Sequence, residues 1–62
     1  MEVNLYYVWM MEKETKREIM NEVCAPNEYW ARKAVEQRAN ISGYNPEKHD
    51  IFKVQFVRKL PY

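Results

Sequence analysis

The chain has few of the residues that cross-link small proteins, bind metals in them or give their backbone flexibility. Among its 62 residues there is one cysteine, Cys24, one glycine, Gly43, and one histidine, His49. A single cysteine excludes a disulfide within the chain, and one Cys with one His falls short of the four ligands of a structural zinc site. One glycine excludes a glycine-rich phosphate-binding loop. We therefore predict no metal and no cofactor.

The chain also lacks a large excess of charge of one sign, and it lacks long apolar runs. The 10 Lys and Arg residues nearly balance the 9 Asp and Glu residues, which leaves a net charge of +1. Such a balance gives no strong electrostatic footprint for nucleic acid or an anionic membrane. No apolar run approaches the roughly 18 residues of a membrane span. The N-terminus lacks the form of a secretion signal, and the free thiol of Cys24 points to a cytoplasmic location.

What the chain does have is aromatic residues, which make up 15% of it. A chain of 62 residues has room for a single domain, which we take to span residues 1–62. A domain of this size buries only about 60% of its unfolded surface, so its core is marginal. Without disulfides or metals, stability must come from good packing or from oligomerisation.

One segment, Pro26 to Ser42, carries both the end signals and the period of a helix. Asn27 is a typical N-cap, Glu28 gives an acidic first turn, and Gly43 is a typical left-handed residue after the last turn. At about 100° per residue one face of this helix is largely apolar. That face comprises Trp30, Ala31, Ala34, Val35, Arg38, Ile41 and Ser42.

Three segments alternate as strands, at residues 3–11, 16–25 and 50–59. The first is apolar on both faces, which is typical of a central strand, and a charged loop at residues 12–15 joins it to the second. We predict an α+β domain of ββαβ order. Its three-stranded, antiparallel-containing sheet has the order 2-1-3, its third strand is parallel to its second, and one helix covers one face.

The alternation also assigns residues to the two faces of the sheet. We expect Val3, Leu5, Tyr7, Trp9 and Met11 to face the helix, together with Arg17, Ile19, Asn21, Val23 and Ala25. We expect Trp9, Trp30, Phe52, Val54 and Phe56 to pack between helix and sheet. The face without a helix would then carry Tyr6, Val8, Met10, Met20 and Val57, with Cys24 and Ile51 beside them.

An uncovered apolar face of that extent often marks an interaction surface. We interpret the chain as a small protein–protein interaction module without enzyme activity, which forms a homodimer through this face. A different protein partner on the same face is one alternative. A shift of strand register that makes the apolar patch smaller is another.

Three positions carry side chains that are candidates for chemistry. Arg38 lies on the apolar helix face, but in the last turn a cation favours the helix dipole and its stem can reach past the sheet edge. Cys24 has no neighbouring base that could activate it, so we expect a small buried apolar residue rather than a nucleophile. His49 and Asp50 are adjacent on a strand and point to opposite faces, so we expect no acid–base pair.

RNA binding is the alternative function from another class. An open sheet face with Tyr6 beside Lys53 and Lys59 could stack a base, as RNA-binding sheets do. The order of elements, over Arg17 to Ala34 and Ile51 to Val57, resembles that of the archaeal large-subunit ribosomal protein LX family. That resemblance implies a ribosome-associated role, although the chain lacks the basic tract that those proteins carry after the helix. Short chains of this kind also resemble accessory proteins of phages and prophages.

Overall fold

The computed structural model describes residues 2–61 and contains, over that range, three strands and two helices. In chain order these are β1 (Asn4–Glu12), β2 (Glu18–Ala25), α1 (Glu28–Gln37), α2 (Ala39–Ser42) and β3 (His49–Lys59). The sheet has the order β2-β1-β3, and β1 is antiparallel to both neighbours, so β3 runs parallel to β2. The predicted α+β fold and strand order are confirmed.

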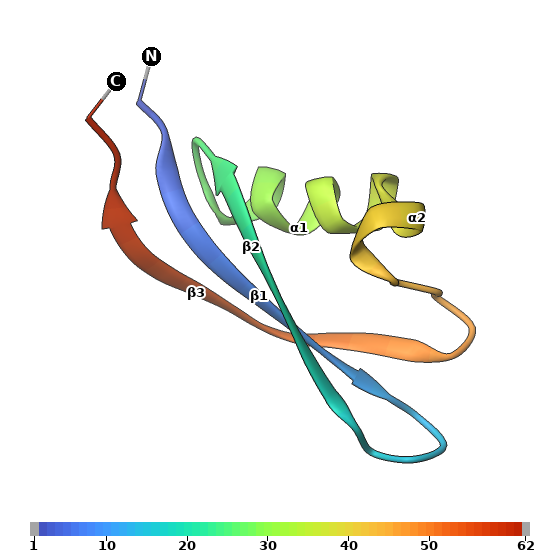
Figure 1. Ribbon diagram of the computed structural model, residues 1–62. Coiled ribbons are helices and arrows are strands. Elements are labelled where there is room, and N and C mark those ends of the chain that lie inside the picture. The colour runs from blue at the N-terminus through green and yellow to red at the C-terminus, as the bar shows by residue number, and fades with distance from the viewer. Residues whose placement is uncertain (1, 62) are drawn as a thin grey trace.

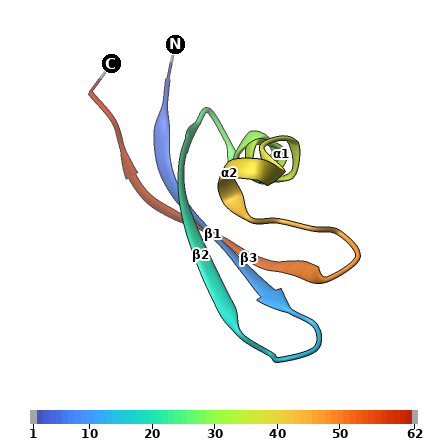
Figure 2. The same ribbon diagram turned by 45° about the vertical axis from the view of Figure 1, so that its right-hand side comes forward.

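Both helices lie on the same side of a strongly twisted sheet (Figures 1 and 2). They cover the half of the sheet where β2 ends, and the β1–β2 hairpin extends beyond them at the other end (Figure 1). The start of β1 and the end of β3 lie together, and Leu60 N donates to Val3 O at 2.9 Å. The molecule is elongated, with extents of 39 × 18 × 16 Å.

The hairpin loop fixes how β1 and β2 pair. Glu12 N donates to Arg17 O at 2.8 Å, and Lys16 N donates to Glu12 O at 2.8 Å. Lys16 has a φ of 63°, the left-handed conformation that closes many hairpins as a one-residue bulge. From this loop onward the pairing is continuous, from Met11 opposite Glu18 to Asn4 opposite Ala25.

The core lies between β1 and the helices, and it corrects the predicted faces of the first strand. Tyr6, Val8 and Met10 are 4%, 0% and 0% exposed, and they form one cluster with Ala31 and Val35 of α1. These three residues, expected on the uncovered face, therefore lie under the helix. Because side chains alternate along a strand, the neighbouring set that includes Tyr7 and Trp9 points to the other face.

The physical reason for this inversion is cross-strand pairing. Residues directly opposite each other share a face, and Met10 lies opposite Ile19 while Tyr6 lies opposite Val23. The prediction that Ile19 and Val23 face the helix is confirmed, since both pack against the core. Their β1 partners are the even-numbered residues, which must then face the helix as well.

Two irregularities in the pairing of β3 change its faces too. The register with β1 shifts between Leu5 and Tyr6 and again between Trp9 and Met10. As a result Ile51, expected on the uncovered face, lies opposite Met10 and packs against the core. Val54 also packs against the core, as predicted. Phe52 and Phe56, however, are about half exposed, at 49% and 52%.

The predicted helix is present but is divided in two. Asn27 caps α1 as predicted, with its Oδ1 accepting from Trp30 N at 3.0 Å. Arg38, with φ −106° and ψ 47°, ends α1 and interrupts the helix before α2. Gly43 follows α2 in the left-handed conformation, as predicted.

Fewer helix residues pack against the sheet than the predicted apolar face contains. Two residues expected in the helix–sheet layer are instead exposed: Trp30 at 50% and Ile41 at 84%. Trp30 packs edge to face on Tyr29, with 5.2 Å between ring centroids. A 10-residue helix buries only the narrow stripe of Ala31 and Val35.

Candidate interaction face of the sheet

The sheet face opposite the helices carries a row of apolar and aromatic side chains along its central strand. Within residues 2–61 no element lies over this face (Figures 1 and 2). Its centre, which we call the central row, consists of Leu5, Tyr7, Trp9 and Met11. All four are half-buried.

The flanking strands supply the rest of this uncovered face. On the β2 side, Met20 lies opposite Trp9 and Cys24 lies opposite Leu5. On the β3 side, Gln55 lies opposite Tyr7 and Lys53 lies opposite Trp9. The face is therefore apolar along its middle, polar on the β3 side and mixed on the β2 side, where Met20 and Cys24 alternate with Glu18 and Glu22. An apolar centre with polar residues around it is typical of interaction surfaces.

Trp9 adds an unmet hydrogen bond to this face. Its indole Nε1 is buried and has no hydrogen-bond partner among the described residues. A buried donor without an acceptor costs about 1–3 kcal/mol of stability. The isolated chain therefore has an unsatisfied hydrogen-bond donor in a residue of the face that its helices leave open.

Of the five residues predicted for the interaction surface, the structure places only some on this face. Tyr6, Val8 and Met10 belong to the core. Met20 is on the uncovered face and 37% exposed, and Val57 is half-buried at the irregular pairing of β3. The prediction placed the central row on the helix side of the sheet. The length of the hairpin loop, four residues, would have placed it on the uncovered face.

The reason is that this number is even. When an even number of residues lies between the two members of the last hairpin pair, each odd-numbered residue on one strand lies opposite an even-numbered residue on the other. The last hydrogen-bonded pair, Glu12 with Arg17, encloses residues 13–16. If Ile19 and Val23 face the helix, the odd-numbered residues of β1 must face away from it.

Cys24 and Arg38 each differ from expectation: Cys24 in its burial, and Arg38 because it lies between two helices and not in the last turn of one. Cys24 is exposed on the uncovered face, not buried. Arg38 is exposed at the end of α1, and it helps to line a groove of about 350 Å³ between β2 and the helices. Asn21 spans the same region, donating from Nδ2 to Ser42 O at 3.3 Å.

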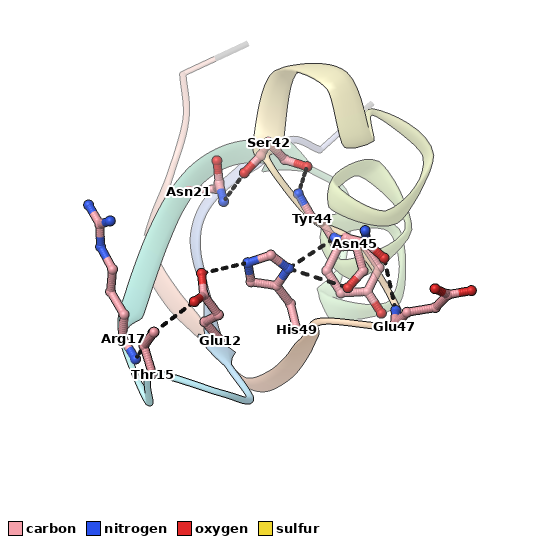
Figure 3. Close-up of polar contacts among 9 residues, drawn as sticks. All are labelled: Glu12, Thr15, Arg17, Asn21, Ser42, Tyr44, Asn45, Glu47 and His49. Atoms are coloured by element: carbon pink, nitrogen blue, oxygen red, sulfur yellow. Dashed lines mark hydrogen bonds and ion pairs between the residues drawn. The ribbon is translucent and has the colours of Figure 1, made fainter.

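His49 lies in a polar cluster on the helix side of the sheet (Figure 3). It begins β3 and is 8% exposed. Asn45 N donates a hydrogen bond to His49 Nδ1 at 3.2 Å, and His49 Nε2 is 3.9 Å from Glu12 Oε2. Thr15 Oγ1 donates to the other oxygen of Glu12 at 2.9 Å. These contacts tie the loop before β3 to the hairpin, which is a structural role.

No protein-family profile, curated protein or solved structure matches the chain. The resemblances to a ribosomal protein family and to phage accessory proteins stay predictions. In residues 2–61 no group of three or more His, Cys, Asp or Glu side chains is placed to hold a metal ion. Over the same residues no helix combines the length and hydrophobicity needed to cross a membrane.

Proposed function

We propose that the chain is a small, non-enzymatic interaction module of the cytoplasm that forms a homodimer through its uncovered sheet face. The observation that carries this proposal is the central row, Leu5, Tyr7, Trp9 and Met11, which no described element covers. The corrected faces move the proposed surface to this row while leaving Met20 within it.

The size of the core supports a homodimer. Only six hydrophobic residues of the described chain are fully buried, and two of them are alanines. Stacking a second sheet on the central row would bury aromatic surface that the chain cannot cover alone, at roughly 25 cal/mol per Å² of apolar area. Two-fold dimers are the commonest soluble oligomers, and sheets pack face to face readily.

The test is solution mass by light scattering across a concentration series. We expect the wild type to show twice its 7.6 kDa chain mass. The variant Tyr7→Lys should be monomeric, because it buries a charge at the centre of the interface. It should still fold, because the new Lys lies opposite Glu22 on β2.

The matched control is Ile41→Lys, which places the same charge on α2, at a residue 84% exposed. It should leave the dimer intact. A wild type that is monomeric at high micromolar concentration contradicts the proposal, as does a Tyr7→Lys variant that keeps the dimer mass.

A second candidate is an RNA-binding surface on the same face. The observation that favours it is that Trp9 lies opposite the basic Lys53 of β3, while Arg58 lies opposite Leu5 at the other side of Tyr7. Aromatic side chains that stack bases next to basic residues are the usual design of RNA-binding sheets. Filter binding of short single-stranded RNA tests it: no salt-dependent binding at tens of micromolar ends this candidate.

A further inference from the structure

The uncovered face has opposite charges along its two sides. On β2 the exposed carboxylates are Glu18 and Glu22, which we call the acidic edge. On β3 the exposed cations are Lys53 and Arg58, which we call the basic edge. Within residues 2–61 none of the four takes part in an ion pair.

The two edges cannot neutralise each other within one chain. They lie on strands either side of β1, which places them two strand spacings apart, about 10 Å. The central row separates them. Any partner that covers this face therefore meets a negative side, an apolar middle and a positive side.

A second copy of the chain can match this layout in only one of two face-to-face arrangements. If the two-fold axis runs along β1, the copy turns over so that its β3 lies above β2 and its β2 lies above β3. If the axis crosses the strands at right angles, β2 lies above β2 and β3 above β3. The first arrangement places unlike charges together, and the second places like charges together.

We propose that two copies pair with the two-fold axis along β1, so that the acidic edge of each lies over the basic edge of the other. This inference rests on the proposed homodimer and specifies its partner surface and orientation. Like charges placed opposite each other at an interface repel and weaken binding, so the charge layout selects one arrangement against the other.

The positions of the charged residues along the strands fit this arrangement. We give each position as the level of the β1 residue that lies opposite. Glu22 lies at the level of Tyr7, Lys53 at the level of Trp9 and Arg58 at the level of Leu5. Each cation of the other copy is thus about 7 Å along the strand from the level of Glu22, on either side. Long side chains span that offset, so Glu22 can reach one cation or both.

One pair of levels brings like charges together. Glu18 and Asp50 both lie at the level of Met11, at the hairpin end of the sheet. Lys13 Nζ lies 3.8 Å from Asp50 Oδ1 and offsets its charge. Stacked sheets also diverge by about 30° between their strand directions, which increases the separation at the ends of the strands.

The orientation can be measured directly by spin-label distances. In a Cys24→Ser background, Glu14→Cys places one label in the exposed hairpin loop of each copy. With the axis along β1 both loops lie at the same end, and with sheets about 10 Å apart we expect label distances below about 30 Å. The crossed arrangement places the loops at opposite ends, well beyond about 35 Å at roughly 3.3 Å per residue.

Charge reversal gives an independent test. Glu22→Lys and Arg58→Glu should each raise the dimer dissociation constant about tenfold or more. The double variant should return it close to the wild-type value, because unlike charges again lie over each other. Glu47→Lys, exposed in the loop before β3, is the matched control and should leave the constant unchanged.

The outcomes separate this inference from the proposed dimer. A wild type that is dimeric but has long label distances overturns the orientation and leaves the dimer standing. A double variant as weak as the single variants does the same. A monomeric wild type overturns both proposals.

Discussion

The ring of Phe56 meets the ring of Tyr6 edge to face, with 5.8 Å between centroids and 76° between planes. The two residues lie opposite each other on β3 and β1. Because Tyr6 is 4% exposed and packs with the helix residues, this contact holds Phe56 on the helix side although half of its surface is in water. This aromatic pair therefore adds to the contacts of Ile51 and Val54 that hold the edge strand β3 against the core.

The pair should contribute measurably to stability. Edge-to-face aromatic pairs are worth about 0.5–1.5 kcal/mol beyond area burial, so we expect Phe56→Ala to lower the free energy of unfolding by about 1–2 kcal/mol. Urea denaturation measures this. Phe52→Ala is the matched control, because Phe52 is 49% exposed and forms no ring pair within the described residues. Equal losses for the two variants would argue against the pair.

Met10 and Met20 test which face of β1 lies in the core. Met10 is 0% exposed and Met20 is 37% exposed. Truncating a fully buried methionine costs about 2–5 kcal/mol, whereas Met20→Ala should cost under about 1 kcal/mol. Both are best measured in the Tyr7→Lys background, where dimerisation should not contribute to apparent stability.

If Met10→Ala fails to fold, Met10→Leu keeps the test usable, since a volume-conserving change should cost less than about 1.5 kcal/mol. A Met20→Ala variant that loses as much stability as Met10→Ala would mean that the uncovered face is packed within the chain. The comparison therefore also bears on the proposed interface.

The element order was predictable because its signals are local. Asn27 and Gly43 mark the ends of the helical segment, and both take the predicted roles at those ends. The strand pattern of residues 3–11 predicts a central strand because both of its faces are apolar. Those same two apolar faces are why alternation alone cannot say which of them meets the helix.

The features that sequence missed arise from backbone conformation. The register shift of β3 between Trp9 and Met10 moves Ile51 to the core, and no glycine or proline marks it. Arg38 interrupts the helix without a glycine or proline, so a continuous 3.6-residue period misplaces Ile41. Tyr6, Val8 and Met10 were assigned to the wrong face for a different reason, the even number of residues in the hairpin loop, which the sequence does contain.

The ends of the chain are joined by an ion pair whose pH dependence can be stated. Lys59 Nζ donates to Glu2 Oε1 at 2.8 Å. This hydrogen bond, and then the charge of Lys59, hold the pKa of the Glu2 carboxyl below its ordinary value of 4.5. Because the folded-state pKa is lowered, the contribution of the pair is present above pH 4.5 and is lost as the pH falls through the folded-state value.

We expect a carbon-13 NMR titration to give Glu2 a pKa below 4.5. Lys59→Met should bring that pKa back toward 4.5, whereas Lys53→Met, which removes a cation from the uncovered face, should leave it unchanged. Equal effects of the two variants would mean that general charge, and not the contact, sets the titration of Glu2.

Among residues 2–61, two adopt the left-handed backbone conformation, and only one of them is suited to it. Gly43 has φ 76° and Lys16 has φ 63°. A side chain costs about 1–2 kcal/mol in this conformation, so Gly43→Ala should lower the free energy of unfolding by about that amount. The loss would come from the backbone alone, because a Cβ at Gly43 would meet nothing within 4 Å.

Lys16→Gly should do the opposite and raise the free energy of unfolding by up to about 1 kcal/mol, since the relieved strain exceeds the added chain entropy. Gly43→Asn serves as the control and should cost less than Gly43→Ala, because asparagine tolerates this conformation. Chemical denaturation of the three variants tests the set. If Lys16→Gly destabilised the chain, the strain at the hairpin would have to be smaller than the entropy that the lysine side chain removes from the unfolded state.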